Sequence, residues 1–150
     1  MSTPIYESDN DRSKQLAVAT YLGQCWASTP ISAPPLAQHD YAMCRYDARD
    51  AKLYAAAYIE VKCRSTLHLP FWVSLTKWQY LATLSETTSC PAFIVIHAAD
   101  TNLVHYIRVT PNPPSTASGG RLDRPDDPKA IEIMAAIPAS LINSAGSLPI

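Results

Sequence analysis

The sequence has no excess of one charge and no long apolar run. Twelve Lys and Arg residues stand against thirteen Asp and Glu residues, which gives a formal net charge of -1. Such a chain has no global basic field, so any DNA contact must come from a few clustered basic groups. No apolar segment approaches the roughly 18 to 20 residues of a membrane-spanning helix, and residues 1–11 are polar and acidic, unlike a signal peptide. We therefore expect a soluble, cytoplasmic protein without a membrane partner.

The sequence also lacks the cysteine spacing of a zinc site. Its four cysteines form no C-x-x-C pair and have no histidine partners at zinc-ligand intervals. We interpret them as buried or free thiols of a reducing compartment. Internal repeats are absent as well, and 150 residues is a usual length for one domain with a substantial core. The expected organisation is a single domain, residues 1–150.

The apolar pattern in the first half of the chain predicts a helix followed by a β-hairpin. Apolar residues at intervals of three and four predict an amphipathic helix over residues 11–26. The proline-rich stretch 28–35 predicts a break. Strands are then predicted over residues 39–46 and 53–63, joined by the turn-prone residues between them.

The second half continues with alternating elements. Ser74 is a good N-cap, and the three tryptophans at positions 26, 72 and 78 fit core positions. The expected elements, in chain order, are a strand at 67–73, a helix at 75–87, strands at 92–98, 103–109 and 130–137, and a helical turn at 139–143. Residues 110–129, rich in proline, glycine and aspartate, predict a long loop. The core is thus expected over about residues 11–109, and a strand and short helix over residues 130–150.

One strand of the hairpin carries an acid and a base within an apolar run. Glu60 and Lys62 are two residues apart, so they point to the same face of the strand, whereas their neighbours point to the other. A carboxylate supplies an oxygen ligand for a hard cation, and an ammonium beside it stabilises developing charge, as a metal-dependent phosphodiesterase needs. The alternative is an ordinary surface ion pair. The apolar residues 54–61 favour the functional interpretation.

Hairpin geometry selects a second acid. If the turn is centred near Asp50, residues whose numbers add to about 100 lie opposite each other, roughly 5 Å apart. Asp40 then faces Glu60. Asp47 and Asp50 lie at the turn, about 30 Å away at roughly 3.3 Å per residue. The alternative for Asp40 is a turn or strand-entry residue without a chemical role.

The order helix, acid-bearing strand, strand with Glu-x-Lys, helix, strand resembles the core of the PD-(D/E)xK nuclease superfamily. Asp40, the block 59–64 and the helix opening 74–78 carry the resemblance, and residues 119–124 also look like a segment of small phage-encoded members. The resemblance implies an α/β fold with a restriction-endonuclease-like core, in which helices flank a central mixed β-sheet. It also implies a protein of the cytoplasm of a bacterium or phage-infected host.

The resemblance further implies roles for particular residues. Asp40 and Glu60 would hold Mg²⁺ or Mn²⁺ together with the main-chain carbonyl of Val61, and Lys62 would orient the attacking water or stabilise the transition state. Family members often carry another acid on the first helix. This chain has Gln15 there, a departure that argues against a second metal ion. The candidates for phosphate contacts are Arg64, Lys77, Arg121 and Arg124.

These features predict a metal-dependent nuclease that hydrolyses DNA, by either endo- or exonuclease action. An alternative is a catalytically inactive nuclease-like fold that acts as a nucleic-acid-binding or assembly module, which the neutral charge and missing helix acid favour. A third hypothesis, an α/β interaction protein with an accidental Glu-x-Lys, predicts that Asp40 and Glu60 lie far apart. In simpler interpretations Lys77 is a solvated helix residue, and Arg121 and Arg124 pair with acids of their own loop. A homodimer is open, since nucleases that cut both strands commonly have two-fold symmetry.

Overall fold

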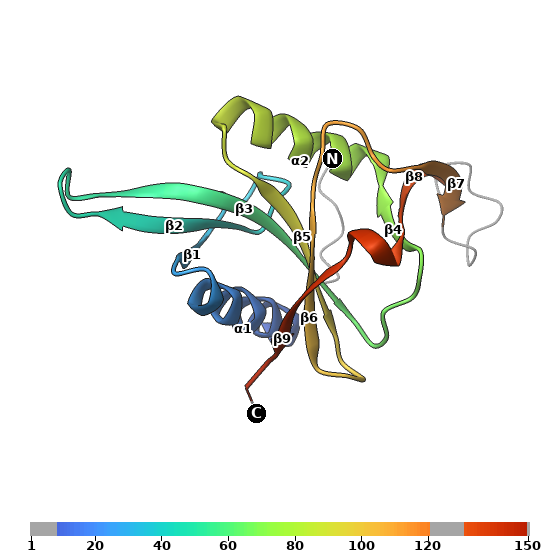
Figure 1. The fold of residues 1–150 in the computed structure, drawn as a ribbon, viewed down its shortest axis with the longest axis horizontal. Helices are drawn as coiled ribbons and strands as arrows, with labels where there is room; N and C mark the ends of the chain where they lie inside the picture. The colour runs from blue at the N-terminus through green and yellow to red at the C-terminus, as the bar shows by residue number, and fades with distance from the viewer. Residues whose placement is uncertain (1–8, 121–130, 150) are drawn as a thin grey trace.

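The computed structural model describes residues 9–120 and 131–149 (Figure 1). The helices and strands, in chain order, are α1 (Asp9–Cys25), β1 (Thr29–Ser32), β2 (Tyr41–Asp47), β3 (Lys52–Arg64), β4 (Phe71–Ser74), α2 (Leu75–Thr88), β5 (Ala92–Ala98), β6 (Leu103–Arg108), β7 (Thr116–Gly120), β8 (Ile131–Ile137), the 3-10 helix Ala139–Leu141 and β9 (Asn143–Ser147). Both predicted α-helices and the predicted hairpin are therefore present.

Six strands form the main sheet, in the order β1-β2-β3-β5-β6-β9. Strands β3 and β5 run parallel, while the other neighbouring pairs are antiparallel. A parallel pair needs a crossover connection, and the chain from β3 to β5 makes it through β4 and α2. This mixed sheet with its helices confirms the predicted α/β, restriction-endonuclease-like core.

The two helices cover opposite faces of the main sheet (Figure 1). On one face, Val18 and Leu22 of α1 are fully buried against Ile59 and Val61 of β3. The other face is covered by α2 and by a small sheet with the order β4-β8-β7. Residues alternate along β3, so the side chains of Glu60 and Lys62 point toward the α2 face.

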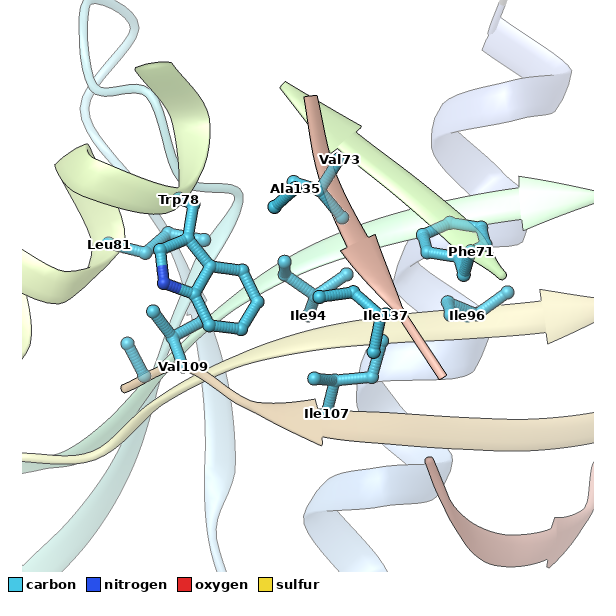
Figure 2. Packing of buried hydrophobic residues seen from close by; sticks show 11 residues of the cluster. Phe71, Val73, Trp78, Leu81, Ile94, Ile96, Ile107, Val109, Ala135 and Ile137 are labelled. Atoms are coloured by element: carbon cyan, nitrogen blue, oxygen red, sulfur yellow. The ribbon is translucent and has the colours of Figure 1, made fainter. Parts of the chain in front are cut away.

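The α2 face is closed by an apolar cluster (Figure 2). Trp78 and Leu81 of α2 lie over the sheet together with residues of β4 and β8, and the Trp78 indole N–H donates a hydrogen bond to the Thr110 carbonyl at 2.9 Å. Burial of a side chain as large as Trp78 stabilises a fold by several kcal/mol, so this cluster fixes α2 on the sheet. Because β8 adds Ala135 and Ile137, the core extends beyond the predicted limit at residue 109.

Three short strands were not predicted. β1 lies inside the predicted break at 28–35, where its Pro30 is tolerated because β1 is an edge strand. β7 lies inside the predicted loop 110–129. Residues 121–129 of that loop are outside the described residues. β9 follows the 3-10 helix and forms the other edge of the main sheet.

The expected core position of Trp72 is wrong. Phe71 and Val73 of β4 point into the apolar cluster, so Trp72 between them points outward and is 43% exposed. Trp78, in contrast, is 1% exposed. Trp26 packs against aromatic side chains of β5 and β6, with its ring centroid 4.8 Å from that of Phe93.

Two expectations from composition can be compared with the structure. All four cysteines are free thiols, of which Cys44 is buried and Cys25 is exposed. Within residues 9–120 and 131–149, neither helix combines the length and the apolar character that a bilayer crossing requires.

Candidate active site

Asp40 lies directly before β2, where that strand meets β3. Tyr41 pairs with Ile59, so the numbers of facing residues add to 100, as the hairpin geometry predicted. The Asp40 N–H donates to the Ile59 carbonyl at 3.0 Å, and its Oδ2 accepts a hydrogen bond from the Val61 N–H at 2.7 Å. The Asp40 carboxylate is thus fixed to the peptide that follows Glu60. This contact contradicts the hypothesis that residues 40 and 60 lie far apart.

The Val61 peptide is directed toward Asp40 by the strand geometry. Along β3, the Tyr58 N–H donates a hydrogen bond to the Pro91 carbonyl on the β5 side. The Ile59 carbonyl accepts one from the Asp40 N–H on the β2 side. The N–H and C=O of one strand residue point to the same side, and successive residues alternate. The Val61 carbonyl therefore points to the same edge as its N–H, which is the edge at which Asp40 stands.

Glu60 is a buried acid held between two lysines. Only 8% of its side-chain surface is exposed. The ammonium of Lys62 lies 3.4 Å from Oε1 and that of Lys77 lies 2.9 Å from Oε2. The predicted common face of Glu60 and Lys62 is confirmed. The alternative of an ordinary surface ion pair is wrong, because a wet strand face would expose the carboxylate.

Lys77 comes from the first turn of α2. Its main-chain N–H donates a hydrogen bond to the Oγ of the N-cap Ser74 at 3.1 Å. Its ammonium also donates to the main-chain carbonyl of Gln38. The Lys77 side chain is only 23% exposed, so the interpretation as a solvated helix residue is wrong. The sequence predicted the N-cap correctly. It did not predict that the cap would place this side chain over Glu60.

A small aromatic group lies near Glu60 and Lys77. His39 Nδ1 lies 2.9 Å from the Tyr80 hydroxyl oxygen, and the His39 ring also contacts the edge of Tyr58 at a centroid distance of 5.2 Å. Burial lowers the pKa of His39; the Glu60 carboxylate raises it and the Lys77 ammonium lowers it. His39 therefore favours the neutral form at pH 7. Its place beside Asp40 in the sequence was the one available signal, and the tyrosine contacts were missed.

Of the other predicted site residues, the structure describes Arg64 and Gln15. Arg64 is exposed at the end of β3, where its guanidinium lies 5.9 Å from the centroid of the Phe71 ring. Gln15 lies on α1, which covers the opposite face of the sheet. Arg121 and Arg124 lie outside the described residues.

The donor atoms at this site fit a hard divalent cation. The Oε2 atom of Glu60 is buried and, among the described residues, has the Lys77 ion pair but no partner with hydrogen-bond geometry. Within residues 9–120 and 131–149 there is no cluster of three or more His, Cys, Asp and Glu side chains that could hold a metal. Two carboxylates and one carbonyl are nevertheless sufficient for Mg²⁺ or Mn²⁺. Mg²⁺ in particular is usually bound by one or two carboxylates plus water and substrate phosphate.

One family model matches almost the whole chain. The model of the family described as "Phage putative PDDEXK endonuclease" matches residues 1–145. The chain belongs to this phage PD-(D/E)xK family. No curated protein matches it. Membership confirms the resemblance and supports nuclease activity at a coarse level. PD-(D/E)xK nucleases generally use divalent metal ions and act on DNA.

Proposed function

We propose that this phage PD-(D/E)xK protein is a metal-dependent nuclease that hydrolyses DNA phosphodiester bonds with Asp40, Glu60 and Lys62. The observation that carries the proposal is the hydrogen bond from the Val61 N–H to Asp40 Oδ2 at 2.7 Å. It fixes one carboxylate beside the strand segment that bears the second carboxylate and its lysine. Family membership supports the same conclusion.

Each residue of the proposed set has a distinct role. Asp40 and Glu60 supply carboxylate oxygens, and Val61 supplies its carbonyl oxygen. A Mg²⁺ or Mn²⁺ ion bound there would lower the pKa of a coordinated water and offset charge on the phosphate. Lys62 is 32% exposed, so its ammonium can reach solvent, orient the attacking water and stabilise the charge of the transition state.

The charges at the site support a phosphate substrate. Two carboxylates and two ammonium groups cancel formally, so a divalent cation would leave a local charge of about +2 in a protein with little net charge. Arg64, Lys77, Arg121 and Arg124 remain the candidates for further phosphate contacts. The proposal also includes a single domain over residues 1–150, a cytoplasmic location and, for double-strand cleavage, a homodimer.

The second candidate function is an inactive nuclease-like module that binds nucleic acid or assembles with other proteins. The observation that favours it is the contact of Lys77 with Glu60, because an ammonium there neutralises the carboxylate without any metal ion. Calorimetry with Mn²⁺ separates the two functions. A nuclease binds the ion, whereas a scaffold has no need of it.

Cleavage assays test the proposal directly. Single-stranded, duplex and branched DNA are incubated with the protein in Mg²⁺ or Mn²⁺, and with EDTA as the metal-free control. We expect metal-dependent cleavage that falls at least about 100-fold in Glu60→Gln, since loss even of an outer-shell partner of a metal costs about 10- to 100-fold. Glu86→Gln is the matched control, because Glu86 is an exposed acid of α2. Cleavage by Glu60→Gln at the wild-type rate would refute the assignment.

A further inference from the structure

Lys77 contacts Glu60, one of the two carboxylates proposed to bind the cation. Its ammonium lies 2.9 Å from Glu60 Oε2 and also donates to the carbonyl of Gln38. It therefore bridges α2, the segment before β2, and β3. Oε2 is buried and, among the described residues, has no partner with hydrogen-bond geometry, so its contact with the Lys77 ammonium is an ion pair, as is that of Oε1 with Lys62.

A divalent cation and this ammonium compete for one carboxylate. Two positive charges within a few ångströms repel each other strongly in a poorly solvated site. Lys77 sits on a flexible four-carbon stem that is 23% exposed, so its ammonium can swing toward solvent when the carboxylate is taken. Lys62 differs because it lies on the same strand as Glu60, at the longer distance of 3.4 Å from the other oxygen.

We propose that Lys77 is a displaceable stand-in for the divalent cation. In the metal-free protein it neutralises Glu60; when the cation binds, its ammonium leaves Glu60 and pairs with a DNA phosphate. This inference rests on the proposed nuclease function and adds a coupling between the two ligands. Each ligand then favours the other, because both draw Lys77 away from the metal-free arrangement.

Calorimetry with Mn²⁺, without DNA, tests the displacement. Neutral variants Lys77→Gln and Lys77→Met should bind Mn²⁺ about tenfold more tightly than wild type, since no ammonium has to be displaced. Lys77→Arg keeps the charge and should bind as wild type does. Lys62→Gln removes the more distant and more exposed ammonium, so it should raise the affinity too, but by a smaller factor of about threefold. Unchanged or weaker binding by the neutral Lys77 variants would overturn the proposal, and so would an equal gain in Lys62→Gln, because net charge alone would explain it.

The salt dependence of DNA binding tests whether the displaced Lys77 pairs with a DNA phosphate. Each phosphate contact by a lysine adds about 1 to the slope of log affinity against log salt concentration. In Ca²⁺, which we use to hold the site without cleavage, Lys77→Gln should lower this slope by about 1. In EDTA it should leave the slope unchanged, because Lys77 is then paired with Glu60. An equal change in both conditions would contradict the proposal.

The outcomes also separate this inference from the proposed function. If wild type binds no Mn²⁺ at millimolar concentration and does not cut DNA, both are wrong. If wild type binds the ion and cuts DNA but the neutral Lys77 variants bind Mn²⁺ as wild type does, only the role of Lys77 is wrong. Thermal unfolding of each variant verifies that it is folded.

Discussion

Substitution of Asp40 separates its chemical role from its structural role. In the structure its carboxylate accepts the Val61 N–H at 2.7 Å. Asp40→Asn keeps an oxygen that can accept this hydrogen bond but removes the charge that a cation requires. Asp40→Ala removes both. The two variants should therefore lose cleavage equally and lose stability to different extents.

The expected magnitudes follow from that hydrogen bond. A hydrogen bond to a charged acceptor contributes about 1.5–3 kcal/mol and a neutral one about 0.5–1.5 kcal/mol, so Asp40→Asn should lose about 1 kcal/mol. Asp40→Ala leaves the Val61 N–H without its partner, which costs about 1–3 kcal/mol, and the partial exposure of Asp40 favours a value near 2 kcal/mol. At about 2–4 °C per kcal/mol for a chain of this size, Tm should fall by about 2–4 °C and about 4–8 °C.

Two assays check the two roles. Thermal unfolding without metal, followed by circular dichroism, gives the order wild type, Asp40→Asn, Asp40→Ala. Cleavage in Mn²⁺ at 25 °C should fall at least about 100-fold in both variants, as for the loss of a metal partner. Asp40→Asn that cuts DNA as well as wild type would refute the catalytic role. Asp40→Ala with an unchanged Tm would refute the structural one.

Three further variants test other parts of the structure. Glu60→Gln removes the carboxylate that Lys62 and Lys77 contact. Because both lysine side chains are partly exposed, the free energy of unfolding should fall by about 1–3 kcal/mol, less than for a fully buried pair. Urea unfolding with no loss would contradict these contacts. Ser74→Ala removes the N-cap of α2 and should lower stability by about 1 kcal/mol in the same assay, whereas an unchanged midpoint would show that the cap is unimportant. Burial and the nearby His97 lower the pKa of His105 from 6.5, so its contribution is complete above about pH 6.5 and is lost as the pH falls through the lowered pKa. His105→Gln should reduce the loss of unfolding free energy between about pH 6.5 and 5, and an unchanged pH profile would contradict this assignment.

The hairpin and its two acids could be predicted because they depend on strand periodicity. The period of two fixes Glu60 and Lys62 on one face, and a single turn fixes which residue faces Glu60. Past Met43 a bulge changes the register by one residue, so the same rule would misplace residues nearer the turn. Asp40 lies on the unshifted side of the bulge. The prediction therefore succeeded where it mattered for the site.

The edge strands could not be predicted from local pattern. The sequences of β7 and β9, TASGG and NSAGS, are small and polar, without apolar alternation. They become strands because a neighbouring strand offers its free hydrogen-bonding groups, which is a tertiary effect. Along α1, the apolar Leu16 is 48% exposed, while Val18 is fully buried. Intervals of three and four fit more than one helical face.

The contact between Lys77 and Glu60 depends on how α2 crosses the sheet. Ser74 and the apolar spacing indicate where the helix begins and which side is buried. They do not indicate which strand lies beneath the first turn. That position is set by the packing of Trp78 and Leu81 against β4, β5 and β8, residues that are distant in sequence (Figure 2).

Anomalous diffraction from crystals of the protein grown with Mn²⁺ shows whether Asp40 and Glu60 bind one ion. We expect an anomalous peak at coordination distance from the carboxylates of both residues, which is lost in Asp40→Asn crystals grown in the same way. A peak confined to other residues, or no peak at saturating Mn²⁺, would contradict this expectation.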